Sequence, residues 1–283
     1  MIEKIVEFQE VKICTEHIGN EGDPAILLMM GATASMLWWD EEFCERLAEK
    51  GYFVIRYDNR DVGKSTTYPR GIPPYTLEDM VHDAIGILDD YNIQQVHLVG
   101  MSLGGLLAQM AALMYEDRVA SLTLYATGPF GPSDPDIPPM DERVLDFQAK
   151  ATEVNWDDEE AVAAYLAEGA AMQSGSGHVF NKERGMNLAK AEFRRANNYI
   201  SMFNHAGLQG GENLYGRVNE IQQPVLLIHG TEDPIWNYRH TQVLLEELKQ
   251  AELLTLEGTG HELHRNDWDA IIDAIDQHVL KNA

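Results

Sequence analysis

Three residues of this chain stand in sequence contexts that suit nucleophilic catalysis. Ser102 is at the centre of the only G-x-S-x-G motif, Asp233 follows an apolar run within His-Gly-Thr-Glu-Asp-Pro, and His261 ends a Gly-Thr-Gly-His run. A serine hydroxyl is a weak nucleophile at neutral pH, so it needs a nearby base and a third group that fixes the tautomer of that base. The order Ser, Asp, His therefore predicts acyl transfer through a covalent intermediate, with these residues as nucleophile, orienting acid and base.

The glycines around Ser102 give its motif a structural meaning. Gly100 ends an apolar run, and Gly104 opens an apolar helical pattern that reaches about Tyr115. In a tight strand-to-helix turn a side chain at either position would collide with nearby backbone, and glycine removes that collision. Glycine early in a helix costs about 1 kcal/mol relative to alanine, so Gly104 indicates a steric requirement. We therefore predict a nucleophile elbow at Ser102.

Alternatives to these assignments lie close by in the sequence. Glu232 competes with Asp233, and His264 competes with His261. Position within the loop favours the aspartate, and the preceding Gly-Thr-Gly favours the first histidine. The two histidines are three residues apart, whereas a helical H-E-x-x-H zinc motif needs four, so we predict no metal site. If Ser102 occupies such a turn but catalyses nothing, the chain would instead be a small-molecule receptor that keeps the fold of an enzyme.

Short apolar runs alternate with amphipathic segments, and these elements must position the three residues. The alternation predicts an α/β fold whose central sheet is mostly parallel, with helices on both faces. The first 18 residues alternate in polarity and predict an antiparallel hairpin at the sheet edge. The expected strands cover 25–30, 52–57, 96–100, 120–125, 224–229 and 252–256, and the expected helices cover 40–50 and 76–90, the latter opening with a capping box at Thr76.

The alternation stops after Tyr125. Residues 128–139 are too rich in glycine and proline to continue a strand or a helix. From 141 to about 216 the pattern is helical, most clearly in 161–172 and 188–203. We therefore expect a core formed by residues 1–127 and 217–283, and a helical cap inserted at 128–216.

Composition narrows the classes of partner. The 283 residues carry a formal net charge of −25 without a basic cluster, which argues against nucleic-acid and anionic-membrane binding. No apolar run of about 18 residues and no signal-peptide pattern is present, so we expect a cytoplasmic protein. Cys14 and Cys44 are too few for a disulfide framework and predict buried thiols. The expected partner is a small molecule, and the pattern assigns no oligomeric state.

The loop after the second apolar strand carries a family resemblance. Residues 56–65, R-Y-D-N-R-D-V-G-K-S, are similar to the D-x-R-G-x-G-x-S stretch of α/β hydrolases, with Asp61 where glycine is usual and Asp58 shaping the turn. With the elbow and the Ser, Asp, His order, the chain resembles an α/β-hydrolase-fold enzyme over nearly its whole length. The run M-G-A at 30–32, followed by Trp38, most resembles the branch of the aclacinomycin methylesterases and related carboxylesterases.

This resemblance implies further residues and an activity. In that family two backbone N–H groups bind the oxyanion, which here implies Leu103 and Ala32 as donors. The implied activity is hydrolysis of small-molecule carboxylic esters through an acyl-enzyme, without a cofactor. Thioester, lactone and perhydrolysis chemistry can use the same triad and remain alternatives, as does the receptor. Epoxide hydrolases and haloalkane dehalogenases of this fold use a carboxylate nucleophile, so Ser102 disfavours both.

Overall fold

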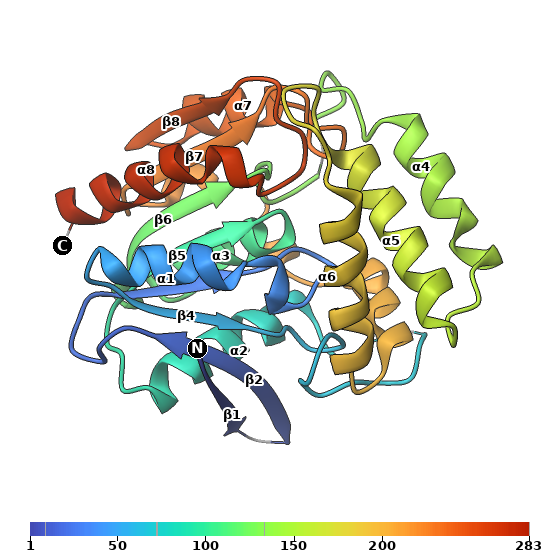
Figure 1. The fold of residues 1–283 in the computed structure, drawn as a ribbon. Coiled ribbons are helices and arrows are strands. Elements are labelled where there is room, and N and C mark those ends of the chain that lie inside the picture. The colour runs from blue at the N-terminus through green and yellow to red at the C-terminus, as the bar shows by residue number, and fades with distance from the viewer. Residues whose placement is uncertain (9, 72, 133, 283) are drawn as a thin grey trace.

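A twisted sheet runs through the centre of the molecule (Figure 1). The computed structural model describes residues 1–282 except 9, 72 and 133. Within these residues the sheet has eight strands in the order β1-β2-β4-β3-β5-β6-β7-β8. The first two strands form the predicted antiparallel hairpin at one edge, β2 pairs antiparallel with β4, and all further pairs are parallel. The strands are β1 (Ile2–Phe8), β2 (Val11–Ile18), β3 (Ala25–Met29), β4 (Phe53–Tyr57), β5 (Val96–Met101), β6 (Val119–Tyr125), β7 (Val225–Gly230) and β8 (Ala251–Leu256).

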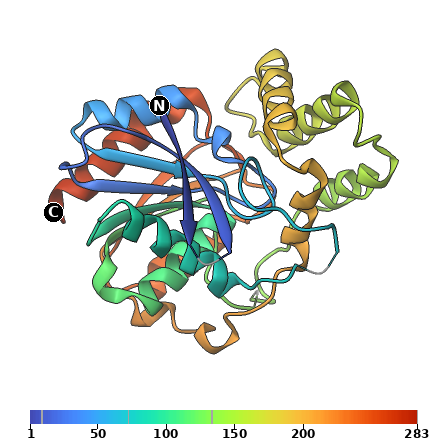
Figure 2. The same ribbon diagram turned by 90° about the horizontal axis from the view of Figure 1, so that it is seen from below.

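Helices cover both faces of the sheet, which confirms the predicted α/β architecture (Figures 1 and 2). Two of them, α1 (Glu41–Glu49) and α8 (Trp268–Lys281), pack in one apolar cluster with alternate residues of the strands. The opposite cluster holds α2 (Leu77–Asp90), α3 (Leu103–Met114) and α7 (Arg239–Glu247). Because apolar clusters cover both faces of the sheet, the parallel strands are mostly apolar. Each expected strand lies within one residue of its observed bounds.

The start of α2 shows how local sequence sets a helix boundary. The Thr76 hydroxyl accepts a hydrogen bond from the Asp79 N–H (3.3 Å), and the Asp79 carboxylate accepts one from the Thr76 N–H (2.8 Å). This reciprocal capping box satisfies two backbone donors that the helix itself leaves unpaired, and it confirms the predicted start. Further along, the Asp83 carboxylate of α2 accepts two hydrogen bonds from the Arg60 guanidinium, at 2.6 and 2.7 Å. The helix therefore also holds the loop after β4.

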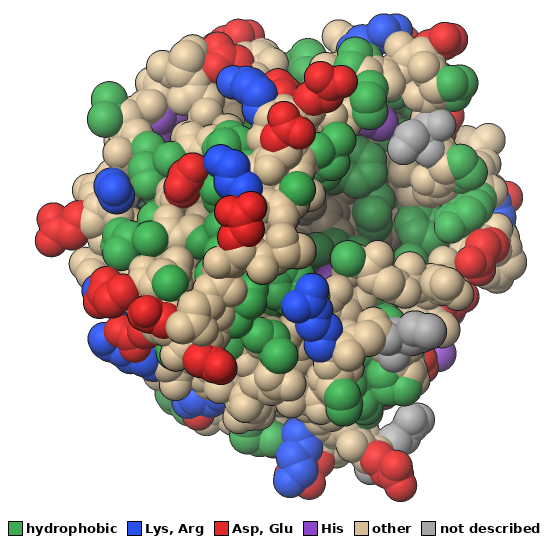
Figure 3. Space-filling model, turned by 90° about the vertical axis from the view of Figure 1, so that its right-hand side faces the viewer, with side chains coloured by type: hydrophobic (Ala, Val, Ile, Leu, Met, Phe, Trp, Pro, Cys, Tyr) green, Lys and Arg blue, Asp and Glu red, His purple; other side chains and the backbone are tan. Residues whose placement is uncertain are grey.

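Between β6 and β7 the described residues form helices and irregular connections without a strand, and we call residues 128–216 the cap. The cap lies beyond the carboxyl ends of the parallel strands (Figure 1). Its helices are α4 (Glu142–Ala149), η3 (Lys150–Glu153), α5 (Glu159–Gln173), α6 (Lys182–Arg195), η4 (Tyr199–Gly207) and η5 (Glu212–Leu214), and η6 (Val218–Glu220) follows it. Seen from the cap side, the molecule is hollowed, and hydrophobic side chains lie in the hollow (Figure 3).

One predicted cap helix is wrong. The pattern indicated a continuous helix over 188–203, but α6 ends at Arg195 and η4 starts at Tyr199, with extended backbone at Ala196 and Asn198. The break comes from Asn197, whose N–H donates to the Gly63 carbonyl (2.8 Å) and whose side chain donates to two further carbonyls of the same loop. Asparagine is a poor helix former because its amide competes for backbone groups, and here those groups belong to another segment.

Two further expectations from the sequence concern the cysteines and membrane-spanning helices. Cys14 and Cys44 are buried and unpaired, as expected. Among the described residues, no helix combines the length and the apolar character that crossing a bilayer requires. The cytoplasmic location stays a prediction.

Candidate active site

Ser102 occupies a strained turn between β5 and α3. Its backbone angles are φ 54° and ψ −118°, a region that residues with a side chain rarely adopt. Such a conformation costs of the order of 1 to 3 kcal/mol and persists only where the surroundings impose it. Here the Ser102 N–H donates to the Tyr125 carbonyl (2.9 Å), and the Thr127 hydroxyl donates to the Ser102 carbonyl (2.9 Å). The neighbouring strand β6 therefore holds Ser102 at the carboxyl edge of the sheet.

The two motif glycines are required by close backbone approaches. A Cβ on Gly100 would lie 2.3 Å from the Gly104 carbonyl oxygen, and a Cβ on Gly104 would lie 2.0 Å from the Met29 carbonyl oxygen. Real contacts of this kind are never so short, and both partners are backbone atoms inside the sheet and the elbow. The glycines therefore let α3 start directly against the end of β3.

Gly104→Ala should destabilise the protein by about 1 to 3 kcal/mol and remove most of its activity. Alanine gains about 1 kcal/mol in helix propensity, but it must displace the end of β3, and the loop that follows β3 passes Ser102. Urea unfolding followed by circular dichroism, with an ester-hydrolysis assay, measures both effects. Gly22→Ala is the matched control, because a Cβ there meets nothing within 4 Å. Equal stability and activity of the two variants would contradict the steric argument.

Asp233 and His261, on the loops after β7 and β8, are hydrogen bonded to each other. The distance from His261 Nδ1 to Asp233 Oδ2 is 2.8 Å, and Asp233 Oδ1 accepts the N–H groups of Ile235 and Trp236, each at 2.8 Å. Burial alone would raise the pKa of Asp233, but His261 and His229 lower it, and the net shift is downward. The ionised carboxylate makes Nδ1 the protonated nitrogen, which leaves Nε2 of the imidazole to accept a proton.

His229 lies next to this pair without an accessible nitrogen. Its Nε2 is 2.8 Å from the Trp236 carbonyl oxygen and 3.3 Å from Asp233 Oδ2, and its Nδ1 contacts the Thr241 hydroxyl. The side chain is buried. His229 therefore contacts the Asp233 carboxylate beside His261, and its role is structural.

The rival residues make other contacts. Glu232 accepts hydrogen bonds from the N–H (2.6 Å) and hydroxyl (2.7 Å) of Ser176 in the cap. The imidazole of His264 stacks on that of His178, with ring centroids 3.9 Å apart. Of these two carboxylates and two histidines, only the predicted acid and base, Asp233 and His261, are hydrogen bonded to each other. Among the described residues, no group of three or more His, Cys, Asp and Glu side chains is placed to hold a metal ion.

Tyr125 connects the elbow to the base loop. Its carbonyl accepts the Ser102 N–H, and its hydroxyl donates to the Glu262 carbonyl, next to His261. Within the described part of the chain, Ser102 Oγ and His261 share no hydrogen bond. Contacts between a nucleophile and its base are often longer than a hydrogen bond until a substrate binds. The structure thus brings the acid and base together and places Ser102 at the same edge of the sheet, with β6 between its strand and that of Asp233.

The predicted oxyanion loop passes directly beside Ser102. A Cβ on Gly31 would lie 3.2 Å from Ser102 Cβ and 3.7 Å from Ser102 Oγ. Ala32 follows, is exposed, and its N–H donates to none of the described residues. Leu103 is the first residue of α3, where backbone N–H groups precede the helix's own hydrogen bonds. Both predicted donors therefore lie beside the nucleophile.

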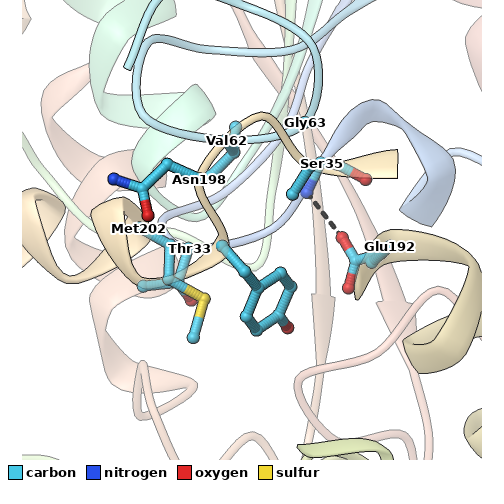
Figure 4. A pocket seen from close by; sticks show the side chains of 9 residues that line it. Thr33, Ser35, Val62, Gly63, Glu192, Asn198 and Met202 are labelled. Atoms are coloured by element: carbon cyan, nitrogen blue, oxygen red, sulfur yellow. Dashed lines mark hydrogen bonds between the residues drawn. The ribbon is translucent and has the colours of Figure 1, made fainter. Parts of the chain in front are cut away.

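Two cap residues that sequence reasoning missed hold the oxyanion loop. The Thr33 N–H donates to His205 Nδ1 (2.9 Å), and the Ser35 N–H donates to Glu192 Oε1 (2.8 Å). Burial raises the pKa of Glu192, although the hydrogen bond from Ser35 partly opposes the shift. Figure 4 shows Glu192 pointing at the Ser35 N–H across a small pocket. Its lining residues are Thr33, Ser35, Val62, Gly63, Glu192, Ala196, Asn198, Tyr199 and Met202. No sequence signal marks a lone histidine and a lone glutamate in a helical segment.

The cap also contacts the base loop. The His261 N–H donates to the Gln173 carbonyl at the end of α5, and the Gly177 N–H donates to the Gly258 carbonyl, each at 2.8 Å. The Glu262 carboxylate accepts the Gly175 N–H at 2.9 Å. The backbone of the predicted base is therefore fixed by the cap as well as by the sheet.

The two aspartates of the family-like loop have structural roles. Asp61 has φ 67°, as the glycine usual there would allow, and its carboxylate accepts hydrogen bonds from the Tyr68 N–H (2.6 Å) and the Tyr75 hydroxyl (2.7 Å). These contacts offset the strain, so the departure from the motif leaves the turn intact. Asp58, as expected, shapes the turn: it accepts the N–H of Lys64 (2.9 Å) and pairs with Arg195.

A strained serine after a central strand, followed by a joined Asp–His pair on two later loops, is the arrangement typical of serine hydrolases built on an α/β sheet. A family model described as alpha/beta hydrolase fold matches residues 24–266, and the chain belongs to this family.

Two relatives support the more specific resemblance to the methylesterase branch. The chain is 29% identical to rhodomycin D methylesterase DauP of Streptomyces sp. (strain C5) and 27% identical to rhodomycin D methylesterase DnrP of Streptomyces peucetius. Each match covers 98% of this chain and 97% of the relative. The resemblance stated from the motifs is thereby confirmed.

Among solved structures, the fold is similar to that of 2-hydroxy-6-oxo-6-phenylhexa-2,4-dienoate hydrolase from Rhodococcus sp. strain RHA1. The TM-score is 0.78 at 24% identity, covering 99% of this chain and 98% of the other. At this identity the likeness confirms the α/β-hydrolase fold.

Proposed function

We propose that the protein is a serine carboxylic-ester hydrolase that acts on small-molecule esters through an acyl-enzyme. The 2.8 Å hydrogen bond between His261 and Asp233, facing the same sheet edge as the strained Ser102, carries the proposal. Ser102 Oγ attacks the ester carbonyl while His261 Nε2 takes its proton. His261 then protonates the departing alcohol, and Asp233 stabilises the imidazolium between these steps. Water activated by His261 attacks the acyl carbon, which releases the acid and restores Ser102.

The backbone N–H groups of Ala32 and Leu103 stabilise the negative charge on the tetrahedral intermediate. Loss of one such donor typically costs about 3 to 4 kcal/mol of transition-state stabilisation. Because the donors are main-chain groups, Met30 in place of the family's usual histidine leaves this function available. The start of α3 adds its positive dipole end beside Ser102.

We further propose methyl esters of apolar acids as the substrate class. Support comes from the methylesterases that match nearly the whole chain, and from the hydrophobic hollow on the cap side (Figure 3). Apolar walls with few polar groups are typical of small-molecule sites. A methyl ester has a small leaving group, so the acid part of the substrate would occupy the hollow.

Matched methyl, ethyl and isopropyl esters of one aromatic acid test this proposal, with the corresponding thioester and lactone beside them. We expect kcat/KM to fall by about tenfold or more from methyl to isopropyl, because added methylenes differ by about 1 to 3 kcal/mol in a shaped pocket. Preference for the thioester or lactone would move the assignment to those alternatives. Saturable binding of every ester without turnover would indicate a receptor.

A further inference from the structure

The two ring nitrogens of His205, a cap residue in η4, are both hydrogen bonded, and the partners fix the tautomer. Nδ1 is 2.9 Å from the Thr33 backbone nitrogen, which can only donate, so Nδ1 accepts. Nε2 is 2.7 Å from the Arg60 carbonyl oxygen, which can only accept, so Nε2 carries the proton. The imidazole is therefore neutral and bridges the oxyanion loop to the loop after β4.

These contacts act on one peptide unit. The Thr33 hydroxyl donates to the Ala32 carbonyl (2.6 Å), and the Thr33 N–H donates to His205. The peptide between Ala32 and Thr33 is thus held at both its oxygen and its nitrogen. Thr33 has φ 64°, a strained value that such contacts must maintain. The preceding N–H, that of Ala32, donates to none of the described residues, and Gly31 before it lies beside Ser102.

We propose that His205 is a positioning residue for the oxyanion hole: as the neutral Nε2–H tautomer it fixes the Ala32–Thr33 peptide and thereby aims the Ala32 N–H at the developing oxyanion. The inference rests on the proposed function. It adds a cap residue to a site whose other proposed members all lie in the sheet loops.

The histidine is itself held in place from both sides. The Arg60 guanidinium is locked by its two hydrogen bonds to Asp83 of α2, which fixes the carbonyl that His205 bonds. On the cap side, the Asn204 amide donates to the Asp61 carboxylate (2.9 Å), so the residue before His205 is bound to the same loop. A continuous set of contacts therefore links α2 to the oxyanion loop through the buried imidazole.

The neutral state of His205 is favoured by its surroundings. Burial lowers the pKa of His205, and this outweighs the opposing effects of the Arg60 carbonyl and the Asp61 charge. The guanidinium of Arg60, whose carbonyl accepts the His205 proton, is itself paired with Asp83. A protonated ring would direct a second N–H at the Thr33 N–H, and two donors facing each other cannot form this contact.

Two substitutions separate the acceptor from the donor. In His205→Asn the amide oxygen replaces Nδ1 and keeps an acceptor for Thr33, whereas in His205→Gln the amide nitrogen replaces Nε2 and leaves the Thr33 N–H unpaired. We expect kcat to fall by about 10- to 100-fold in His205→Gln, with far smaller losses in His205→Asn. KM should change by less than about threefold in either variant, because losing the contact that holds the Ala32–Thr33 peptide weakens an interaction made in the transition state. The exposed His82→Asn is the control for a histidine-to-asparagine change.

Amide exchange supplies a readout that does not depend on turnover. The peptide containing Thr33 should exchange faster in His205→Gln than in the parent and His205→Asn. Equal losses of kcat in the two variants, accompanied by equal losses of thermal stability, would overturn the positioning role, as would parental kcat in His205→Gln. If the parent itself shows no turnover and no covalent adduct with an organophosphonate, the proposed function fails, and that result is recognisable before any variant is made.

Discussion

Ser102→Ala should lower kcat by about 10⁴- to 10⁶-fold and abolish covalent labelling by an organophosphonate. The variant removes the hydroxyl that forms the acyl-enzyme and keeps the Cβ, so the strained turn and its two backbone hydrogen bonds are retained. Intact mass should show one adduct on the parent and none on the variant, and p-nitrophenyl esters should show a burst only with the parent.

The exposed cap residue Ser176 provides the control, because Ser176→Ala removes a hydroxyl that contacts Glu232 and not His261. We expect it to label and turn over. An adduct on Ser102→Ala, or turnover within tenfold of the parent, would place the nucleophile elsewhere.

Asp233→Asn should lower kcat by about 10⁴-fold with little change in the unfolding midpoint. The amide oxygen can still accept the N–H groups of Ile235 and Trp236. The amide nitrogen then faces His261 Nδ1 as a donor, which moves the imidazole proton to Nε2 and removes the base. Pre-steady-state measurement of acylation tests this directly.

Glu232→Gln is the control, because it makes the same change from carboxylate to amide at the adjacent residue, whose carboxylate contacts Ser176 in the cap. We expect less than about tenfold loss, since only a hydrogen bond at the surface changes. If Glu232→Gln were as inactive as Asp233→Asn, the assignment of the acid would be wrong.

The sheet and the loops of the acid and base were predictable because their signals are local. The parallel strands are mostly apolar runs bounded by turn residues, and the predicted triad residues follow the carboxyl ends of β5, β7 and β8. Gly100 and Gly104 likewise predicted the close backbone approaches that the structure shows at the turn around Ser102. The placement of Asp233 against His261 follows from the pairing of β7 with β8, which two neighbouring apolar runs already indicate.

The contacts of the cap were not predictable, since they depend on residues far apart in sequence. His205 and Thr33 are 172 positions apart, and Glu192 and Ser35 are 157 apart. A helical periodicity reports which face of a segment is apolar, not which distant N–H a buried side chain bonds. The same limit explains the break at Asn197: its partners lie in the loop after β4, and the local pattern around it remains helical.

The pairing of β6 with β7 across the whole segment 126–224 has a consequence for synthesis on the ribosome. The nucleophile emerges early, whereas its acid and base emerge only after the cap, and the final strands must close a long loop to reach the sheet. A partly made chain therefore displays Ser102 without a base to activate it.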